Sequence, residues 1–349
     1  MIDGIQTTTY HFDVDKLVND EKLDFAPDLA PLSMGGLVVG YTTKVRGELF
    51  VKIKLHYEHK GKYYPYPKPK LVISGSLHKF KDGQNDTDFH FMEVYSTIDA
   101  LCKLLSLEPS KCEIHTLEFG VNIPLGMRPK DVFDTYLSYC QKGFVSYKDV
   151  NQNARFNGVK CSLSQFGIKV YDKGAQYFRK ESLMRFECQV LKMQFLEKKN
   201  VFIKTLQDLK NKEVHERLSN ILTSLHDDIL KVNKCDTSKM NDKEKMLFDN
   251  GQNLKYWEQI KNGTMNTNTA KVKMKREKQR FKSINEDYKT DDRHGQTGHL
   301  IGEKCKVLIK KTVPIFTNFE PTFKNVTVPL FTLCIKVNKG TFNPLPIYF

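Results

Sequence analysis

Three residues with reactive side chains lie in segments where apolar and polar residues alternate. Glu118 lies in HTLEFGVNI, Tyr171 in GIKVYDK and Glu187 in LMRFECQVLK. Because successive side chains of a strand point to opposite faces, the apolar positions define one face and these three residues share the other. Two carboxylates on one surface supply the hard oxygen ligands that Mg²⁺ or Mn²⁺ prefers, and such an ion polarises a phosphate. The tyrosine adds a nucleophile for a phosphodiester.

Cationic side chains accompany the tyrosine on the predicted polar face. Lys169 and Lys173 lie two positions either side of Tyr171, and Arg185 lies two positions before Glu187. Nearby positive charge favours the phenolate, whose usual pKa of about 10 is too high for a good nucleophile. The chain has no Gly-rich phosphate loop, and attack by tyrosine on DNA needs no ATP. The alternative is that these charges form a structural ion network on an ordinary solvated sheet face.

Two further residues are candidates for the same site. His78 falls on the polar side of LVISGSLH and is the predicted third metal ligand, with a place at the edge of the core as the alternative. Tyr177 is the second candidate nucleophile. The eight cysteines are scattered without a CxxC pair, which favours small buried apolar groups over zinc ligands.

The elements that must position these residues predict an α+β fold, with an antiparallel sheet and helices on one of its faces. Apolar periodicity predicts strands over 48–56, 70–78, 114–123, 159–163, 167–173 and 183–192, and helices over 87–105 and 129–140. We divide the chain into an N-terminal segment (1–45), a catalytic domain (46–196), a helical and basic segment (197–290) and a small β-rich C-terminal unit (291–349).

The charge balance points to a polyanionic partner. Lysine and arginine number 55 against 41 aspartates and glutamates, a net charge of +14, and DNA or RNA is the usual partner of so basic a protein. The run KVKMKREKQRFK (271–282) is the densest basic stretch, and a solvated linker is its alternative reading. The predicted phosphate contacts in it are Lys271, Lys273, Lys275, Arg276, Lys278 and Arg280.

We expect a soluble cytoplasmic protein, because the sequence has neither a secretory leader nor an apolar run long enough to span a membrane. The helices predicted over 197–262 leave three roles open: packing on the sheet, forming a homodimer, or holding DNA. A host helicase is a further candidate partner.

Three short motifs in order resemble rolling-circle replication initiators of plasmids (the Rep_trans type), which are akin to phage gene II/X replication proteins and some conjugative relaxases. The family pattern is an acidic (R/T)LD strand, an (I/V)Y(D/N)K strand and an R-x-E strand. Here these motifs read Thr116-Leu117-Glu118, Val170-Tyr171-Asp172-Lys173 and Arg185-Phe186-Glu187, within a resemblance that covers about 70–195.

The resemblance implies a fold like the HUH or RNP palm and a strand-nicking activity at a supercoiled or hairpin origin. By position, Tyr171 would be the nicking tyrosine, Glu118 and Glu187 the metal-site acids, Lys173 an electrostatic helper and Arg185 a phosphate contact. Two departures stand out: a Glu replaces the usual Asp in the first motif, and no paired histidines are present.

Two rival functions remain. A conjugative or mobilisation relaxase would use the same chemistry for DNA transfer. A non-catalytic nucleic-acid-binding module would instead stack bases on aromatic residues of the open sheet face. The positions of Phe119 and Phe186 on the predicted apolar side disfavour that module.

Overall fold

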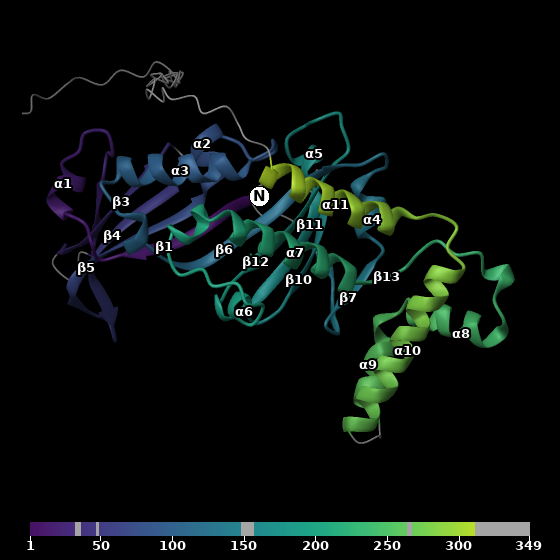
Figure 1. Cartoon of the computed structure of the whole chain (residues 1–349). Coiled ribbons are helices and arrows are strands. Elements are labelled where there is room, and N and C mark those ends of the chain that lie inside the picture. The colour runs from purple at the N-terminus through teal and green to yellow at the C-terminus, as the bar shows by residue number, and fades with distance from the viewer. Residues whose placement is uncertain (32–35, 47–48, 148–156, 264–266, 311–349) are drawn as a thin grey trace, which may run out of the picture. The chain divides into compact units, whose positions relative to one another are not determined.

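The computed structural model describes residues 1–31, 36–46, 49–147, 157–263 and 267–310. Its main feature is a ten-stranded sheet whose neighbouring strands all run antiparallel (Figure 1). The strands are, in sheet order, β2 (Ala26–Leu29), β3 (Val38–Val45), β4 (Leu49–His59), β5 (Lys62–Ser76), β1 (Ile2–Thr9), β6 (Glu113–Pro124), β12 (Leu183–Val190), β11 (Phe166–Asp172), β10 (Gly158–Ser162) and β9 (Val145–Ser146). A smaller sheet joins β13 (Leu230–Lys231), β7 (Tyr136–Tyr139) and β8 (Lys142–Gly143).

Long helices cover one face of the large sheet, as predicted. The covering helices are α3 (Phe91–Leu104), α7 (Lys212–Asp228) and α11 (Arg293–Lys310), and α7 and α11 pack side by side (Figure 1). The shorter helices are α1 (Val14–Val18), α2 (Leu77–Asp82), α4 (Pro129–Phe133), α5 (Lys173–Gln176) and α6 (Gln194–Glu197). The predicted α+β class is therefore confirmed.

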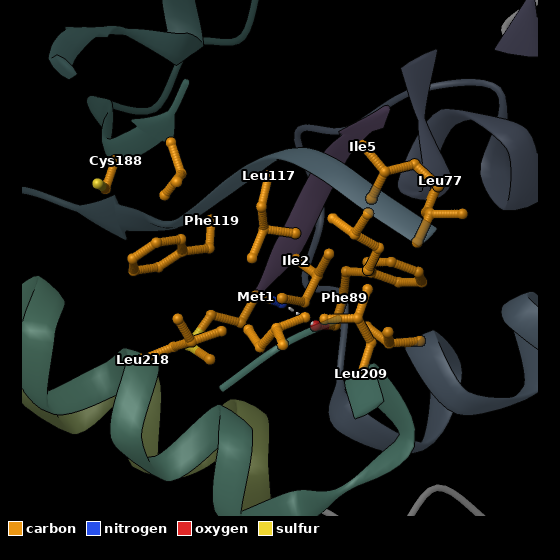
Figure 2. Close-up of a cluster of buried hydrophobic side chains, with 14 of the residues drawn as sticks. Met1, Ile2, Ile5, Leu77, Phe89, Leu117, Phe119, Cys188, Leu209 and Leu218 are labelled. Carbon is orange, nitrogen blue, oxygen red and sulfur yellow. Dashed lines mark hydrogen bonds between the residues drawn. The ribbon is translucent and has the colours of Figure 1, made fainter. Parts of the chain in front are cut away.

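The core lies between this sheet face and the helices. Leu117 and Phe119 of β6 are fully buried and point toward Leu218 of α7 (Figure 2). Their alternation with polar residues along β6 explains the arrangement, because one side of the strand is apolar and the other is not. The strands predicted over 114–123, 159–163, 167–173 and 183–192 are confirmed within a few residues.

Several predicted boundaries are wrong. β1 lies between β5 and β6, so a boundary after residue 45 would cut the sheet. Helix α4 ends at Phe133, and β7 takes up the rest of the helix predicted over 129–140. Residues 293–310 form helix α11 rather than β structure, and its buried Ile301 and Leu308 belong to the main core. The remaining β-rich prediction, over 311–349, lies outside the described residues.

A second core forms where three helices pack together: α8 (Asp242–Gly251), α9 (Leu254–Asn262) and α10 (Thr267–Asp287). The rings of Trp257 and Phe281 meet edge to face with centroids 5.7 Å apart. Gly251 of α8 lets this helix lie close against α10, since a Cβ on Gly251 would lie 2.3 Å from the Phe281 ring. Within the described part of the chain, no helix combines the length and apolarity needed to cross a bilayer.

Candidate active site on the open face

The open face is the side of the large sheet turned away from α3, α7 and α11. Cross-strand register places Glu118 opposite Gln189, and Lys169 opposite Glu187. Tyr171 lies two residues beyond Lys169 on β11 and shares its face. Directly opposed residues of antiparallel strands present their side chains on the same face. Glu118, Tyr171 and Glu187 therefore share one face of the sheet, as the alternation predicts, and their roles there stay predictions.

Lys169 joins the two glutamates. Its Nζ lies 2.9 Å from Oε1 of Glu118 and 3.2 Å from Oε1 of Glu187. Burial and the Glu187 charge raise the pKa of Glu118. The pKa of Glu187 is lowered despite its burial, because Lys169 and Arg185 both stabilise its charge. The two carboxylates therefore differ in their tendency to ionise, and Glu187 is the one held as an anion.

The Tyr171 hydroxyl donates to Oε2 of Glu187 over 3.3 Å. The side chain is only 6% exposed, and burial together with the Glu187 charge raises its pKa well above the usual value. The prediction that nearby lysines favour the phenolate is wrong for this arrangement, because the Lys169 charge is engaged by carboxylates. A phosphate can reach the phenol only after neighbouring side chains move.

Arg185 is the centre of a buried polar network. Its Nε donates to Glu187 (2.8 Å), one terminal nitrogen to Asn122 (3.1 Å) and the other to Asp3 (2.9 Å). The residue is 3% exposed, so the prediction of a phosphate contact is wrong for Arg185 in this structure. Its guanidinium instead ties together β12, β6 and β1, and every carboxylate in the network has a cationic partner.

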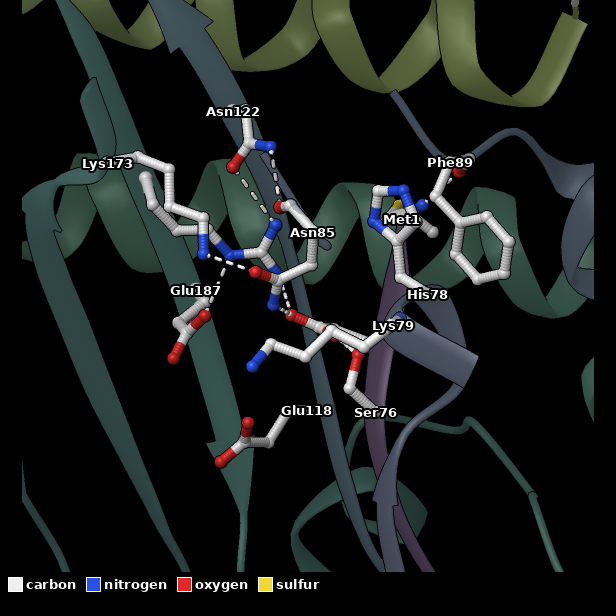
Figure 3. Close-up of polar contacts among 12 residues, drawn as sticks. Met1, Ser76, His78, Lys79, Asn85, Phe89, Glu118, Asn122, Lys173 and Glu187 are labelled. Atoms are coloured by element: carbon white, nitrogen blue, oxygen red, sulfur yellow. Dashed lines mark hydrogen bonds and ion pairs between the residues drawn. The ribbon is translucent and has the colours of Figure 1, made fainter. Parts of the chain in front are cut away.

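The segment around Asn85 covers this end of the open face (Figure 3). The side-chain oxygen of Asn85 accepts from Lys173 Nζ and from the Tyr177 hydroxyl, each over 2.7 Å, and its nitrogen donates to Asp3 over 2.7 Å. Burial and the Arg185 charge lower the pKa of Lys173 to about 7. Tyr177, the second candidate nucleophile, is thereby held in a structural hydrogen bond.

His78 is not at the site. It lies in α2, where its ring stacks on Phe89 with centroids 4.6 Å apart and its Nε2 lies 3.3 Å from an Asp82 oxygen. Figure 3 shows it turned away from Glu118 and Glu187. The strand predicted over 70–78 ends at Ser76, which caps α2, and this change of element removes His78 from the face.

The described donors do not fit the predicted Mg²⁺ or Mn²⁺ site. Among the residues that the structure describes, no three His, Cys, Asp or Glu side chains are grouped so that they could hold a metal ion. Oε1 of Glu118 accepts from Lys169 and, over 2.6 Å, from the Gln189 amide, and the two oxygens of Glu187 pair with Lys169 and Arg185. Oxygens that neutralise cationic side chains are poor candidates for ion ligands.

The basic run lies on α10. This helix is far from the glutamates in sequence and packs in the second core, with α8 and α9. Met274 and Phe281 bury one side of the helix. The predicted phosphate contacts Lys271, Lys275, Arg276 and Arg280 are exposed, and Lys273 and Lys278 are partly buried. Nζ of Lys278 lies 5.6 Å from the centre of the Trp257 ring. The helix therefore presents a basic side to solvent, suited to salt-sensitive phosphate contacts.

Three residues of the site were not anticipated from the sequence. Asp3 and Asn85 complete the network around Arg185, and Tyr147 packs its ring 6.1 Å from that of Tyr171. Asp3 carried a weak signal, since it is the acidic position between apolar Ile2 and Ile5 of β1. Asn85 carried none, because it lies in a connection whose position depends on the tertiary fold.

No protein-family model matches the chain, and no curated protein matches it in sequence. Among solved structures, the chain is similar to a rolling-circle replication initiator protein from Geobacillus stearothermophilus, with a TM-score of 0.36 and 14% identity. The match covers 68% of this chain and 88% of that one. A similarity at this level carries no functional argument, so the function proposed for this chain rests on its own residues.

Proposed function

We propose that this chain binds DNA and initiates rolling-circle replication by nicking one strand, with Tyr171 as the nucleophile. The observation that carries the proposal is the Tyr171 hydroxyl donating to Glu187, in the same cluster as Lys169 and Glu118. The net charge of +14 supports a polyanionic substrate. The three short motifs in order on β6, β11 and β12 support the particular chemistry.

In the proposed step, the Tyr171 oxygen forms a bond to phosphorus and the bond from phosphorus to the 3′ oxygen breaks. The phenol proton passes to the Glu187 carboxylate that already accepts it. The 3′ oxygen takes a proton from water and leaves as a free 3′-OH, and the proton held on Glu187 neutralises the hydroxide left behind. The DNA stays on the protein as a 5′-phosphotyrosine. Attack by a 3′-OH on this linkage reverses the step and rejoins a strand.

Two lysines support this chemistry. Lys169 is the partly exposed cation of the cluster and would stabilise negative charge on the phosphoryl oxygens. Nζ of Lys173 lies 5.5 Å from the centre of the Tyr171 ring, and a pKa of about 7 lets it exchange a proton near neutral pH. Because Tyr171 is buried, the proposal includes a movement of its neighbours when DNA binds.

A dependence on Mg²⁺ or Mn²⁺ stays a prediction, and no step above is routed through an ion. It is tested by running the nicking reaction with each ion and with a chelator. Loss of nicking with the chelator, restored by one of the ions, would show that an ion site forms with ligands beyond those grouped among the described residues.

The test of the proposed function is a nicking assay on supercoiled DNA that carries the coding sequence and its flanks. We expect nicked circles and a covalent protein–DNA adduct from the unmodified protein and from Tyr177→Phe, and neither product from Tyr171→Phe. Tyr177→Phe is the matched control, because it removes a phenol hydroxyl from the same network. Nicking by Tyr171→Phe at the unmodified rate would refute the proposal.

A further inference from the structure

The open face carries an exposed aromatic residue at some distance from the glutamates. Phe50 of β4 is 51% exposed, although its neighbours Leu49 and Val51 are fully buried in the core. Alternation along the strand therefore places Phe50 on the open face. Phe50 lies near the start of β4, the third strand from the β2 edge of the sheet, so its ring is available to a ligand on this face.

Register connects Phe50 to the candidate active site. Phe50 is opposite Ser74 of β5, Ser74 is opposite Gln6 of β1, and Gln6 is opposite Thr116 of β6. Glu118 lies two residues further along β6 and so shares the face. The row crosses three strand spacings, roughly 15 Å. Along it Gln6 is exposed and Ser74 and Thr116 are half-buried, so the surface between Phe50 and Glu118 is open to solvent.

Four lysines share the open face with Phe50. Lys44 is opposite Phe50 on β3, and its Nζ lies 4.7 Å from the ring centre. Lys52 and Lys54 follow at alternate positions of β4, and Lys70 is opposite Lys54 on β5. Each is exposed or half-buried.

Of these four, Lys52 has an acidic partner, Asp28, at 2.6 Å. Lys70 lies 5.7 Å from the exposed ring of Tyr10, so a second aromatic ring stands at the edge of the cluster. The surface combines positive charge with aromatic rings, which matches a strand of nucleic acid whose bases are unpaired.

We propose that Phe50, Lys44, Lys52, Lys54 and Lys70, together called the Phe50 platform, bind single-stranded DNA. Phe50 stacks on a base, the lysines contact phosphates, and the strand continues past Gln6 toward Glu118. Stacking requires a base whose face is free, which a single strand offers and an intact duplex does not. That the nucleic acid is DNA rests on the proposed function. The platform would hold the strand beside the nicking site.

The test measures binding of a fluorescently labelled single-stranded oligonucleotide to the full chain by anisotropy. We expect Phe50→Ala to weaken binding about tenfold or more, because one base loses its stacking partner, and Phe50→Trp to retain it. Phe202→Ala is the matched control, since Phe202 is 63% exposed and lies outside the sheet; we expect no change. Equal binding by the unmodified protein and Phe50→Ala would overturn the proposal.

Two further arms separate this proposal from its rivals. A duplex of the same sequence is expected to bind with no loss in Phe50→Ala, and an equal loss on duplex would overturn the assignment to single strands. Tighter binding of the matching RNA than of the DNA would overturn the assignment to DNA. Tyr171→Phe is expected to bind the single strand normally, so failure of nicking and failure of the platform give different results.

Discussion

The hydroxyl of Tyr171 lies 3.3 Å from Oε2 of Glu187, across the pair of strands β11 and β12. The same carboxylate binds Lys169 through its other oxygen and Arg185 through Oε2. Glu187 is therefore the residue through which the phenol, the lysine and the arginine are coupled. Its charge state governs both the stability of this end of the sheet and the proposed proton transfer.

The two glutamates are expected to respond differently to the same substitution. Glu187→Gln should lower the free energy of unfolding at pH 7 by about 3–5 kcal/mol, because Arg185 loses a buried partner. Glu118→Gln should change it by about 1 kcal/mol or less, since burial disfavours the Glu118 charge and that residue is more exposed. Urea unfolding followed by circular dichroism gives both values. Equal costs for the two variants would contradict the ion-pair assignment.

The pH dependence of stability has a sign set by Glu187 and Asp3. Their folded-state pKa values lie below the ordinary 4.5 and 3.8, so the unfolded chain binds more protons as the pH falls. Their contribution is complete above about pH 4.5 and is lost as the pH falls through the folded-state values. Unfolding measured between pH 2 and 7 should show this loss, and Glu187→Gln should flatten it.

Glu118 should act in the opposite direction in the same titration. Its folded-state pKa is raised, so its contribution is present below about pH 4.5 and is lost as the pH rises through the folded-state value. Glu118→Gln should therefore make the increase of stability with pH steeper. A flatter profile in this variant would show that the carboxylate is stabilised as an anion.

Arg185→Leu should be strongly destabilising, by about 3–5 kcal/mol, because Asp3 and Glu187 lose their shared buried cation. Arg217→Leu is the control, since Arg217 pairs with the exposed Glu213 of α7 and its loss should cost about 1 kcal/mol or less. Thermal or urea unfolding measures the difference. A similar loss of unfolding free energy in the two variants would contradict the buried ion pairs of Arg185 with Asp3 and Glu187.

The basic side of α10 should contribute salt-dependent and sequence-independent affinity for DNA. Replacing Lys275, Arg276 and Arg280 by alanine should weaken binding of unrelated DNA sequences alike. It should also reduce the slope of log affinity against log salt by about 1 for each phosphate that the helix no longer binds. Lys212→Ala, an exposed lysine of α7, is the control. Unchanged slopes would show that α10 is a solvated helix whose basic residues do not contact phosphates.

The sequence predicted the face of each strand better than it predicted what covers that face. The alternation in β6, β11 and β12 fixes which residues lie together, because the side-chain period of a strand is two, and Glu118, Tyr171 and Glu187 do meet. It could not predict that Asn85 covers this end, since that interaction depends on the path of a connection. The burial of Tyr171 and the engagement of Arg185 follow from such long-range interactions.

The differences between the predicted and observed helices and strands also have physical causes. A short apolar run such as VLI in α11 is consistent with a strand or with a buried helix, and its packing against α7 decides for the helix. β1 lies near the centre of the sheet although it is rich in threonine and has few apolar residues. Both of its neighbouring strands come from later in the chain, so the local sequence does not indicate this position. The sequence alone does not mark Phe50, because its exposure depends on which neighbouring strands flank β4.

The most direct test of the proposed chemistry is to identify the residue that carries DNA in the covalent adduct. The protein is reacted with DNA that carries its coding sequence and flanks, the adduct is digested, and the peptide bearing the nucleotide is sequenced by mass spectrometry. We predict a single modified residue, Tyr171. Attachment of DNA to Tyr147 or Tyr177, or no attachment while circles are still nicked, would contradict the assignment of Tyr171 as the nucleophile.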